Sequence, residues 1–403
     1  MKQLFFLLTG ICLLLPVLIL AQDSVSAKNP NPFAAGINQF PLKQNVSLKF
    51  LNIYEDGEKT SKTNSEDVFI MYNRFIANGF AIGGQVSAGW SGDHNGTEYL
   101  SRDWSVGLNF TYGKHFSDNF NMYVRLGGKY GQEKDITEYT GNTFTDKWNK
   151  YGFTGRVAFP FVLNPAKTVY LTPSLNYQYT TYDYDDSKET DNELGFYMGF
   201  EDYSDCDEMG YDRNRRFSAN MYNQGSAFVD YYSKFAVDFT GNKTEYDNST
   251  TGDYRYNISQ VRLNTKAAYY IVDNLAVGAS VRLDAGSSKE KDTDYKSSWT
   301  EWKIGPLVNF NIPTKTCWNN MFLEGGAEWG GYAYKDDYGT GTTTDKYKVF
   351  EWNAGVGYNI FIGPNVSLTP KIGWEQMAET NKDDDSKYET KGVVFRLGTR
   401  YSF

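Results

Sequence analysis

The sequence predicts an all-β fold, an antiparallel sheet that closes into a membrane-spanning barrel. Three observations support this prediction. Polar and apolar residues alternate along most of the chain, the apolar set repeatedly includes Trp or Tyr at the ends of runs, and charged residues recur in the polar set. The 403 residues contain 17% aromatic side chains although the mean hydropathy is only −0.56. Such an aromatic content argues against a disordered chain.

Composition also excludes several classes of protein. A formal net charge of −9 disfavours nucleic-acid binding, because an acidic chain repels phosphate. Three cysteines are too few for a disulfide scaffold. After the first 21 residues no second apolar run is long enough for a membrane-spanning helix.

Residues 1–21 have the pattern of a secretory signal peptide. Lys2 is the basic start, an apolar stretch follows, and Ala21 offers a cleavage site. An uncleaved anchor helix is the alternative, and Pro16 within the run disfavours it. We therefore expect a mature chain that leaves the cytoplasm.

Period-2 alternation is clearest in residues 80–90, 104–112 and 352–360. In residues 104–112, the apolar set from Trp104 to Tyr112 alternates with a set of small and polar residues. Each run has the length of a tilted membrane-spanning strand, about 9–11 residues. A secreted soluble β-protein would also alternate, so the identity of the polar set must decide between the two.

The polar set contains charges in many strands, which favours a membrane barrel with lipid outside and water inside. Aromatic residues near strand ends suit the two membrane interfaces. The charges that we predict to line the lumen are Arg125, Lys129, Arg156, Arg282, Lys303, Glu324, Glu328, Lys371, Glu375, Arg396 and Arg400.

The last strand carries the most specific motif. The chain stops at Phe403 within an alternating run, and its apolar set includes Phe395, Leu397, Tyr401 and Phe403. This ending resembles the terminal signal of Gram-negative outer-membrane β-barrel proteins. The resemblance implies location in the cell outer membrane, contact with outer-membrane lipid, and recognition of the last strand by the barrel-assembly machinery.

The chain also repeats itself at a spacing of about 195–199 residues. Residues 75–86 match 270–281, and 169–173 match 366–370. The repeat predicts a tandem duplication of an eight-strand unit, each similar to small eight-stranded outer-membrane barrels. The predicted organisation is a signal peptide (1–21), a periplasmic N-terminal segment (22–44), a first repeat (45–203), a periplasmic linker or plug (204–227) and a second repeat (228–403).

Two closures are compatible with sixteen predicted strands: one 16-stranded barrel or two tandem 8-stranded barrels. Side chains just fill an eight-stranded barrel, whereas sixteen strands leave an aqueous channel. We favour one barrel, because Arg125, Lys129 and Arg156 have few inward acids in their own half. A shared lumen would balance them against Glu324, Glu328 and Glu375.

Short and long connections alternate along the chain, which predicts short periplasmic turns and longer outer loops. Polar stretches near 56–66, 134–146 and 335–345 are among the expected outer loops. The segment 204–227 would lie on the periplasmic side. Cys206 and Cys317 would share that side, where a disulfide between them or two free thiols are both compatible with the sequence.

No catalytic motif is evident, and we expect no enzymatic activity, cofactor, metal or nucleic-acid partner. His94, beside Asp93, is the one weak candidate for a hydrolase. Acid-rich runs such as Asp383–Asp385 are more typical of solvated loops than of Ca²⁺ sites. A homo-oligomer is compatible with the sequence, although no strand shows a distinctive interface patch.

The sequence favours a porin-like diffusive channel for small hydrophilic solutes, in which inward charges set ion preference. The alternative is a non-conducting structural or surface-binding outer-membrane barrel.

Overall fold

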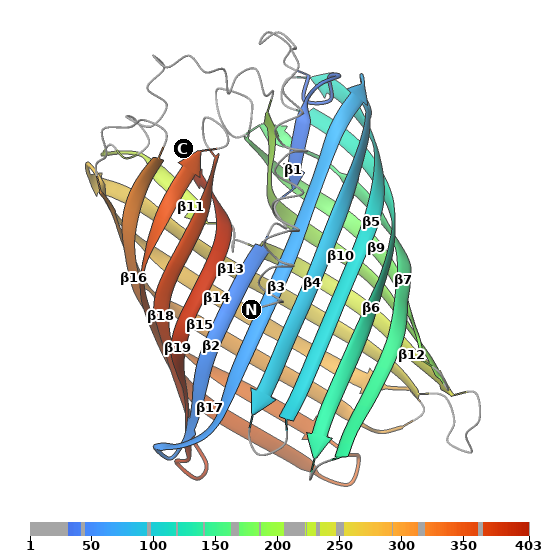
Figure 1. The fold of residues 1–403 in the computed structure, drawn as a ribbon, viewed down its shortest axis with the longest axis vertical. Coiled ribbons are helices and arrows are strands. Elements are labelled where there is room, and N and C mark those ends of the chain that lie inside the picture. Colours follow the sequence, from blue (N-terminus) through green and yellow to red (C-terminus); the bar gives the residue numbers. More distant parts are fainter. Residues whose placement is uncertain are drawn as a thin grey trace.

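A computed structural model (Figure 1) describes residues 31–41, 45–94, 98–117, 120–139, 142–162, 169–184, 187–204, 222, 224–230, 234–246, 254–291, 293–312, 319–361 and 366–402. Within these ranges the regular structure is entirely strand, in nineteen elements. Among them there is no helix that is long and apolar enough to cross a membrane.

Ten strands come from the first half of the chain. They are β1 (Asn38–Pro41), β2 (Asn45–Glu55), β3 (Glu58–Ala77), β4 (Phe80–His94), β5 (Glu98–Ser117), β6 (Phe120–Tyr139), β7 (Asn142–Ala158), β8 (Phe161–Val162), β9 (Val169–Asp183) and β10 (Ser187–Ser204).

Nine strands come from the second half. They are β11 (Ala227–Asp230), β12 (Lys234–Tyr246), β13 (Tyr254–Val272), β14 (Leu275–Glu290), β15 (Lys296–Ile312), β16 (Asn319–Asp337), β17 (Thr342–Phe361), β18 (Val366–Asn381) and β19 (Lys387–Ser402).

The long strands form one closed antiparallel circuit. It runs from β2 to β7, through β9 and β10, and then from β12 to β19. Pairing of β10 with β12 joins the two halves on one side, and pairing of β19 with β2 joins them on the other. The circuit therefore has no open edge, which satisfies the backbone hydrogen-bonding groups that a membrane would otherwise leave unpaired.

At one end of the barrel the short strand β1 closes the first half on itself. It pairs with β3 through Asn38↔Arg74 and with β10 through Asn38↔Ser204. This creates an eight-stranded circuit of β1, β3, β4, β5, β6, β7, β9 and β10. We call the interior of this circuit the first neck.

The short strand β11 closes the second half in the same way. It pairs with β13 through Phe228↔Ala268 and with β19 through Phe228↔Ser402. The interior of the resulting circuit, β11 with β13 to β19, is the second neck. Figure 1 shows the two groups of strands diverging toward the end where β1 and β11 lie.

Both circuits are possible because β10 and β19 change partners along their length. Residues 187–198 of β10 pair with β12, whereas residues 201–204 pair with β1. Residues 388–397 of β19 pair with β2, whereas residues 400–402 pair with β11. The barrel is thus wide over most of its length and splits into two narrow necks at one end.

These pairings confirm a transmembrane antiparallel β-barrel. The predicted number of sixteen strands is not confirmed as such, because the described residues contain nineteen, sixteen long ones and three of four residues or fewer. Sixteen long strands form one circuit in the wide part of the barrel, and two eight-stranded circuits form the necks. Neither predicted closure therefore accounts for all the described strands. The same pairing pattern occurs in each half, while the tandem duplication remains a prediction.

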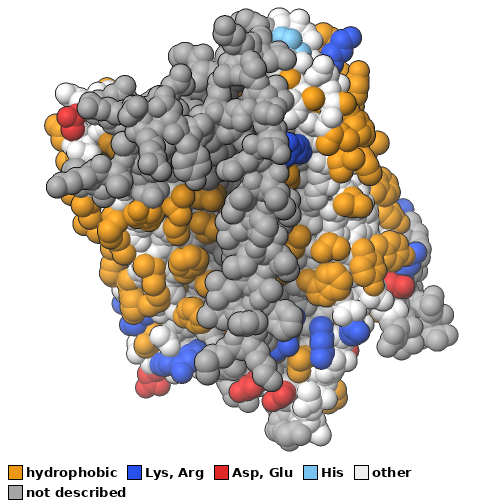
Figure 2. Space-filling model, turned by 45° about the horizontal axis from the view of Figure 1, so that its top comes forward, with side chains coloured by type: hydrophobic (Ala, Val, Ile, Leu, Met, Phe, Trp, Pro, Cys, Tyr) orange, Lys and Arg blue, Asp and Glu red, His pale blue; other side chains and the backbone are white. Residues whose placement is uncertain are grey.

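The two faces of the wall are assigned as the alternation predicts. In β5, Trp104, Leu108 and Tyr112 are exposed, whereas Ser105 and Asn109 are buried. Figure 2 shows hydrophobic side chains spread over the flank of the barrel. Apolar side chains therefore face outward and polar ones inward, the inverse of a soluble barrel.

The expected outer loops are largely strand. The stretch 56–66 lies mostly in β3, because a two-residue hairpin at Asp56 and Gly57 allows the ladder to begin at once. Both turn residues have positive φ, 47° and 90°, as a type I′ turn requires. Strands of up to 20 residues then continue the wall beyond the width of a bilayer.

Part of the predicted N-terminal segment belongs to the barrel itself. Within 22–44, residues 38–41 form β1, and Phe33 is fully buried in the first neck. The signal peptide and most of 204–227 lie outside the described residues.

Candidate functional site

The first neck is filled by aromatic side chains around Phe33. Its ring lies 5.4 Å from that of Phe75, 5.8 Å from that of Tyr203 and 6.3 Å from that of Tyr123, measured between centroids. All four side chains are at most 3% exposed. An eight-stranded circuit has an interior that side chains just fill, and these residues fill it.

Glu201 of β10 is the hub of a polar network beneath these rings. Its Oε1 accepts hydrogen bonds from the Tyr123 hydroxyl (2.6 Å) and lies 3.0 Å from Nη2 of Arg156. Its Oε2 accepts from Nε2 of Gln39 (3.1 Å) and from the Tyr203 hydroxyl (2.8 Å). Three hydrogen-bond donors and one ion pair, from four strands in all, therefore stabilise this buried carboxylate.

Arg125 of β6 joins the same network through neutral partners. Its Nη2 donates to Oε1 of Gln39 (2.6 Å), its Nε to the Thr111 hydroxyl (3.1 Å), and its Nη1 lies 3.3 Å from Sδ of Met71. The side chain is only 4% exposed.

The second neck is built around a buried cation in place of a buried carboxylate. Arg400 of β19 donates to both oxygens of Asp230 (2.6 and 3.1 Å) and to Oε2 of Glu324 (2.8 Å). Glu324 Oε1 also accepts from Lys371 at 2.6 Å. The guanidinium lies 3.9 Å from the Phe228 ring centroid and 4.6 Å from that of Phe322.

Asparagines complete the packing of the second neck. Oδ1 of Asn311 accepts from the amides of Asn320 and Asn359 (3.2 Å each), and Asn359 also donates to Asn320 (2.7 Å). Nδ2 of Asn311 donates to the Tyr270 hydroxyl at 2.7 Å. These four side chains are at most 5% exposed, so the network holds its neck closed by direct contacts.

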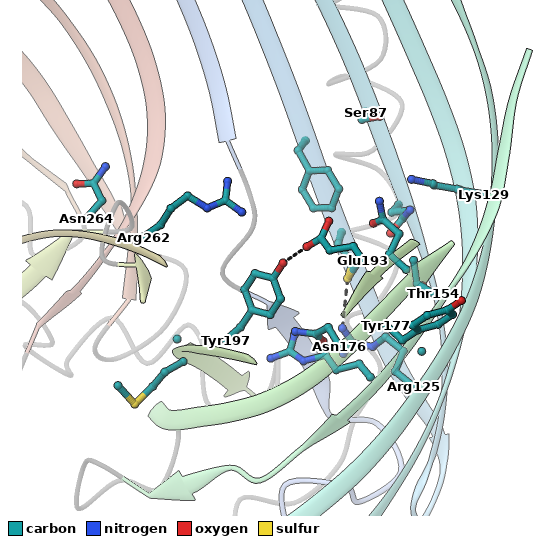
Figure 3. Close-up of a pocket in the computed structure, with 18 of the residues that line it drawn as sticks. Ser87, Arg125, Lys129, Thr154, Asn176, Tyr177, Glu193, Tyr197, Arg262 and Asn264 are labelled. Carbon is teal, nitrogen blue, oxygen red and sulfur yellow. Dashed lines mark hydrogen bonds between the residues drawn. The ribbon is translucent and has the colours of Figure 1, made fainter. Parts of the chain in front are cut away.

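A cavity of about 760 Å³ lies between the two halves, in the wide part of the barrel. Figure 3 shows Arg262 and Asn264 of β13 on one side, with Lys129, Thr154 and Tyr177 on the other. The Tyr197 hydroxyl donates to Glu193 within it. Its lining has six basic side chains (Arg125, Lys129, Lys150, Arg156, Arg262, Arg282) and four acidic ones (Glu193, Glu201, Asp284, Glu301).

Ion pairs and hydrogen bonds order the wall of the cavity in the second half. Glu301 lies 3.1 Å from Lys303 and 3.7 Å from Arg282, and Lys303 also donates to Glu351 at 3.0 Å. Asp284 Oδ1 accepts from Nε1 of Trp299 at 2.9 Å. These contacts hold Arg282, Asp284 and Glu301 in place in the lining of the cavity.

Comparison with known proteins identifies the class of this barrel. Residues 33–201 match the family model of the outer membrane protein beta-barrel domain. The chain is an outer-membrane β-barrel protein. It resides in the cell outer membrane, and the described strands of both halves share the architecture of the matched region. No curated protein matches the sequence.

Solved structures of outer-membrane barrels share a general likeness with this outer-membrane protein. A bacterial polysaccharide outer membrane secretin is 11% identical, with 90% of this chain and 98% of that chain covered and a TM-score of 0.36. The β domain of the Bordetella autotransporter BrkA is 11% identical (91% and 98% covered, TM-score 0.30). The translocator domain of autotransporter NalP from Neisseria meningitidis is 10% identical (91% and 88% covered, TM-score 0.25). These scores are too low to relate the chain to any one of the three.

The predicted lumen charges of this outer-membrane barrel fall into three groups. Arg125, Lys129, Arg156 and Arg282 line the central cavity. Glu324, Lys371, Arg396 and Arg400 surround a small space of the second neck, and Arg396 pairs with Glu375. Lys303 and Glu328 are buried, at 3% and 5% exposure.

The prediction that cations of the first half are balanced by acidic residues of the second half is wrong for Arg156 and Glu324. Arg156 pairs with Glu201 of its own half, and Glu324 pairs with Lys371 and Arg400 of its own half. The reason is that β1 and β11 close each half around its own network before the two halves can share a lumen at that height.

Several predicted features lie outside the described residues. They are Cys206, Cys317 and the terminal Phe403, together with the side chain of His94. Of the other three residues in the terminal motif, Tyr401 is buried, and Phe395 and Leu397 are partly exposed. Within the described part of the chain, no group of three or more His, Cys, Asp or Glu side chains could hold a metal ion.

The sequence reasoning missed four residues that define the necks: Phe33, Gln39, Glu201 and Asp230. Glu201 could have been found, because it continues the inward set of Gly195, Tyr197 and Gly199 in β10. The others precede the long strands of their halves, where too few residues alternate to give a signal.

Proposed function

We propose that this outer-membrane barrel is closed to free diffusion and holds a small hydrophilic solute in its central cavity. The observation that carries the proposal is the filling of both necks. Phe33, Tyr123 and Tyr203 fill one, and Arg400 with its carboxylates and the asparagine network fill the other. A solute that entered the cavity would meet packed side chains at the neck end.

The orientation of the barrel supports this interpretation. The necks lie at the end that carries the turns at Asn78–Gly79 and Asp273–Asn274 and the end of β19. Short turns occur at both ends of the barrel, since Asp56–Gly57 is a two-residue hairpin at the opposite end. The orientation therefore rests on the predicted periplasmic segment 204–227, because the strands that flank it, β10 and β11, meet the necks at this end. The cavity would then be reached from outside the cell and blocked toward the periplasm.

A porin-like diffusive channel is the second candidate, and the cavity favours it. One continuous circuit of long strands surrounds a space whose lining includes ten charged side chains. That arrangement is typical of a hydrated lumen. The two candidates differ in whether the necks conduct ions.

Planar-bilayer recording distinguishes them. We expect purified full-length protein to give no stepwise conductance, and the double variant Phe33→Ala/Tyr123→Ala to give steps because two rings leave the first neck. The matched control is Trp104→Ala/Tyr130→Ala, which removes two rings from the lipid-facing surface. Steady conductance of the unmodified protein would establish the channel instead.

A further inference from the structure

Two guanidinium groups meet where the central cavity adjoins the first neck. Arg125 of β6 and Arg156 of β7 are direct cross-strand partners, and both line the cavity. Both also lie over the Tyr123 ring, at 5.1 and 5.6 Å from its centroid. Like charges directly opposite one another on neighbouring strands are destabilising, so this pair calls for a compensating anion.

The described residues supply only part of that compensation. Glu201 pairs directly with Arg156, and it reaches Arg125 only through Gln39. The other described hydrogen-bond acceptors of Arg125 are the Thr111 hydroxyl and the Met71 sulfur, both neutral. The buried guanidinium of Arg125 and the partly buried one of Arg156 therefore share one carboxylate, which leaves one positive charge without a direct counter-ion among the described residues of this junction.

In the second neck, by contrast, the positive charges are compensated by direct contacts with carboxylates. At a spacing of 199 residues, Glu324 corresponds to Arg125 and Arg400 to Glu201. Arg400 pairs with Asp230 and Glu324, and Glu324 also pairs with Lys371. Arg400 and Lys371 there meet two carboxylates directly, whereas Arg125 and Arg156 of the first half share one.

The cavity as a whole has the same sign. Its lining carries two more basic than acidic side chains, although the sequence has a net charge of −9. A recess with a net charge of one sign within low-dielectric walls raises the local concentration of counter-ions. Anions are therefore attracted to the cavity of a protein that otherwise repels them.

We propose that Arg125 and Arg156 form a binding site for the oxyanion group, carboxylate or phosphate, of a small solute in the central cavity. The planar fork of Arg matches both groups in a bidentate manner. A cavity of about 760 Å³ has the size of a small-molecule site. This inference rests on the proposed solute-binding function and names the chemical class of the solute.

Isothermal titration of the full-length protein in detergent with inorganic phosphate, and separately with citrate, tests the site and distinguishes the two sources of oxyanion. We expect one of the two anions to bind with a Kd of about 1 mM or tighter. Arg125→Gln should weaken that binding about tenfold or more, and Arg125→Lys should give an intermediate loss because it keeps the charge without the fork. The matched control is Arg102→Gln, which removes the same charge from an exposed position in β5.

The outcomes separate cleanly. Binding that Arg125→Gln weakens and Arg102→Gln leaves within about twofold supports the site. Absence of binding of both anions, or equal weakening by the two Gln variants, overturns it. Heat-modifiable migration on gels checks the fold of each variant, and Arg156→Gln replaces Arg125→Gln if that variant does not fold. Failure of the oxyanion site leaves the bilayer recording unaffected, so it is distinguishable from failure of the closed barrel.

Discussion

Removal of Arg400 is the sharpest test of the energetics of the second neck. Its guanidinium is 2% exposed and makes three hydrogen bonds to Asp230 and Glu324. Arg400→Met replaces it with an apolar side chain and leaves Asp230 as a buried carboxylate without its partner. Breaking a buried pair in this way costs about 3–5 kcal/mol. At about 1.4 kcal/mol per tenfold change, the folding equilibrium should fall between about a hundredfold and a few thousandfold.

The double variant Arg400→Met/Asp230→Met separates pairing from simple loss of contacts. It removes both charges of the closest pair, while Glu324 keeps Lys371 at 2.6 Å. Replacing a buried ion pair by apolar residues is often neutral or stabilising, so the double variant should be more stable than the single one. A useful control is Lys391→Met, whose partner Glu389 lies at 3.4 Å and whose side chain is 29% exposed. That partly exposed pair should contribute at most about 1 kcal/mol.

The assay is urea unfolding of the barrel in lipid vesicles, followed by Trp fluorescence and by heat-modifiable migration. We expect the order of stability to be control, then double variant, then Arg400→Met. A cost of less than about 1 kcal/mol for Arg400→Met would contradict the reasoning, because it would mean that water screens the pair as at a surface.

Two further predictions concern strand pairing and pH. In a background in which Cys206 and Cys317 are Ser, Leu194→Cys/Phe239→Cys and Phe40→Cys/Asp202→Cys should each form a disulfide in the folded protein, because both are register partners of β10. Leu194→Cys/Asp238→Cys should not, since neighbouring residues of a strand face opposite sides; mass spectrometry reads all three, and failure of either of the first two would disprove the exchange of partners. Separately, the Ser386 hydroxyl and amide donate to Asp384 at 2.7 and 3.0 Å and lower the pKa of that carboxyl. The hairpin stability from these bonds is therefore present above the ordinary pKa of about 3.9 and lost as pH falls through the lower folded value. Ser386→Ala should raise the pKa of Asp384 in a carboxyl NMR titration, and an unchanged value would refute the assignment.

The alternation of side chains determined the architecture because it depends on local sequence alone. Runs such as 104–112 show both which residues face lipid and which face the interior, and the structure places Trp104 and Asn109 accordingly. The presence of a closed barrel follows from the same pattern, since open edges are not tolerated in lipid.

The closure of the barrel could not be predicted in this way because it depends on contacts between distant parts of the chain. Residues 187–204 alternate continuously, and nothing in them indicates that the partner changes from β12 to β1. The strand β1 has four residues, too few for a periodic pattern. The networks around Glu201 and Arg400 depend on that closure. Their partners Gln39 and Asp230 could therefore not be predicted from the sequence pattern either.

The most direct test of closed necks is the access of water-soluble reagents to them. In the background lacking Cys206 and Cys317, Ala158→Cys places a thiol in the core of the first neck, and Ser87→Cys places one in the cavity wall. A charged methanethiosulfonate reagent should label the thiol at position 87 in the folded protein and label that at 158 only after unfolding. Equal labelling of both positions in the folded barrel would show a hydrated first neck and contradict the account.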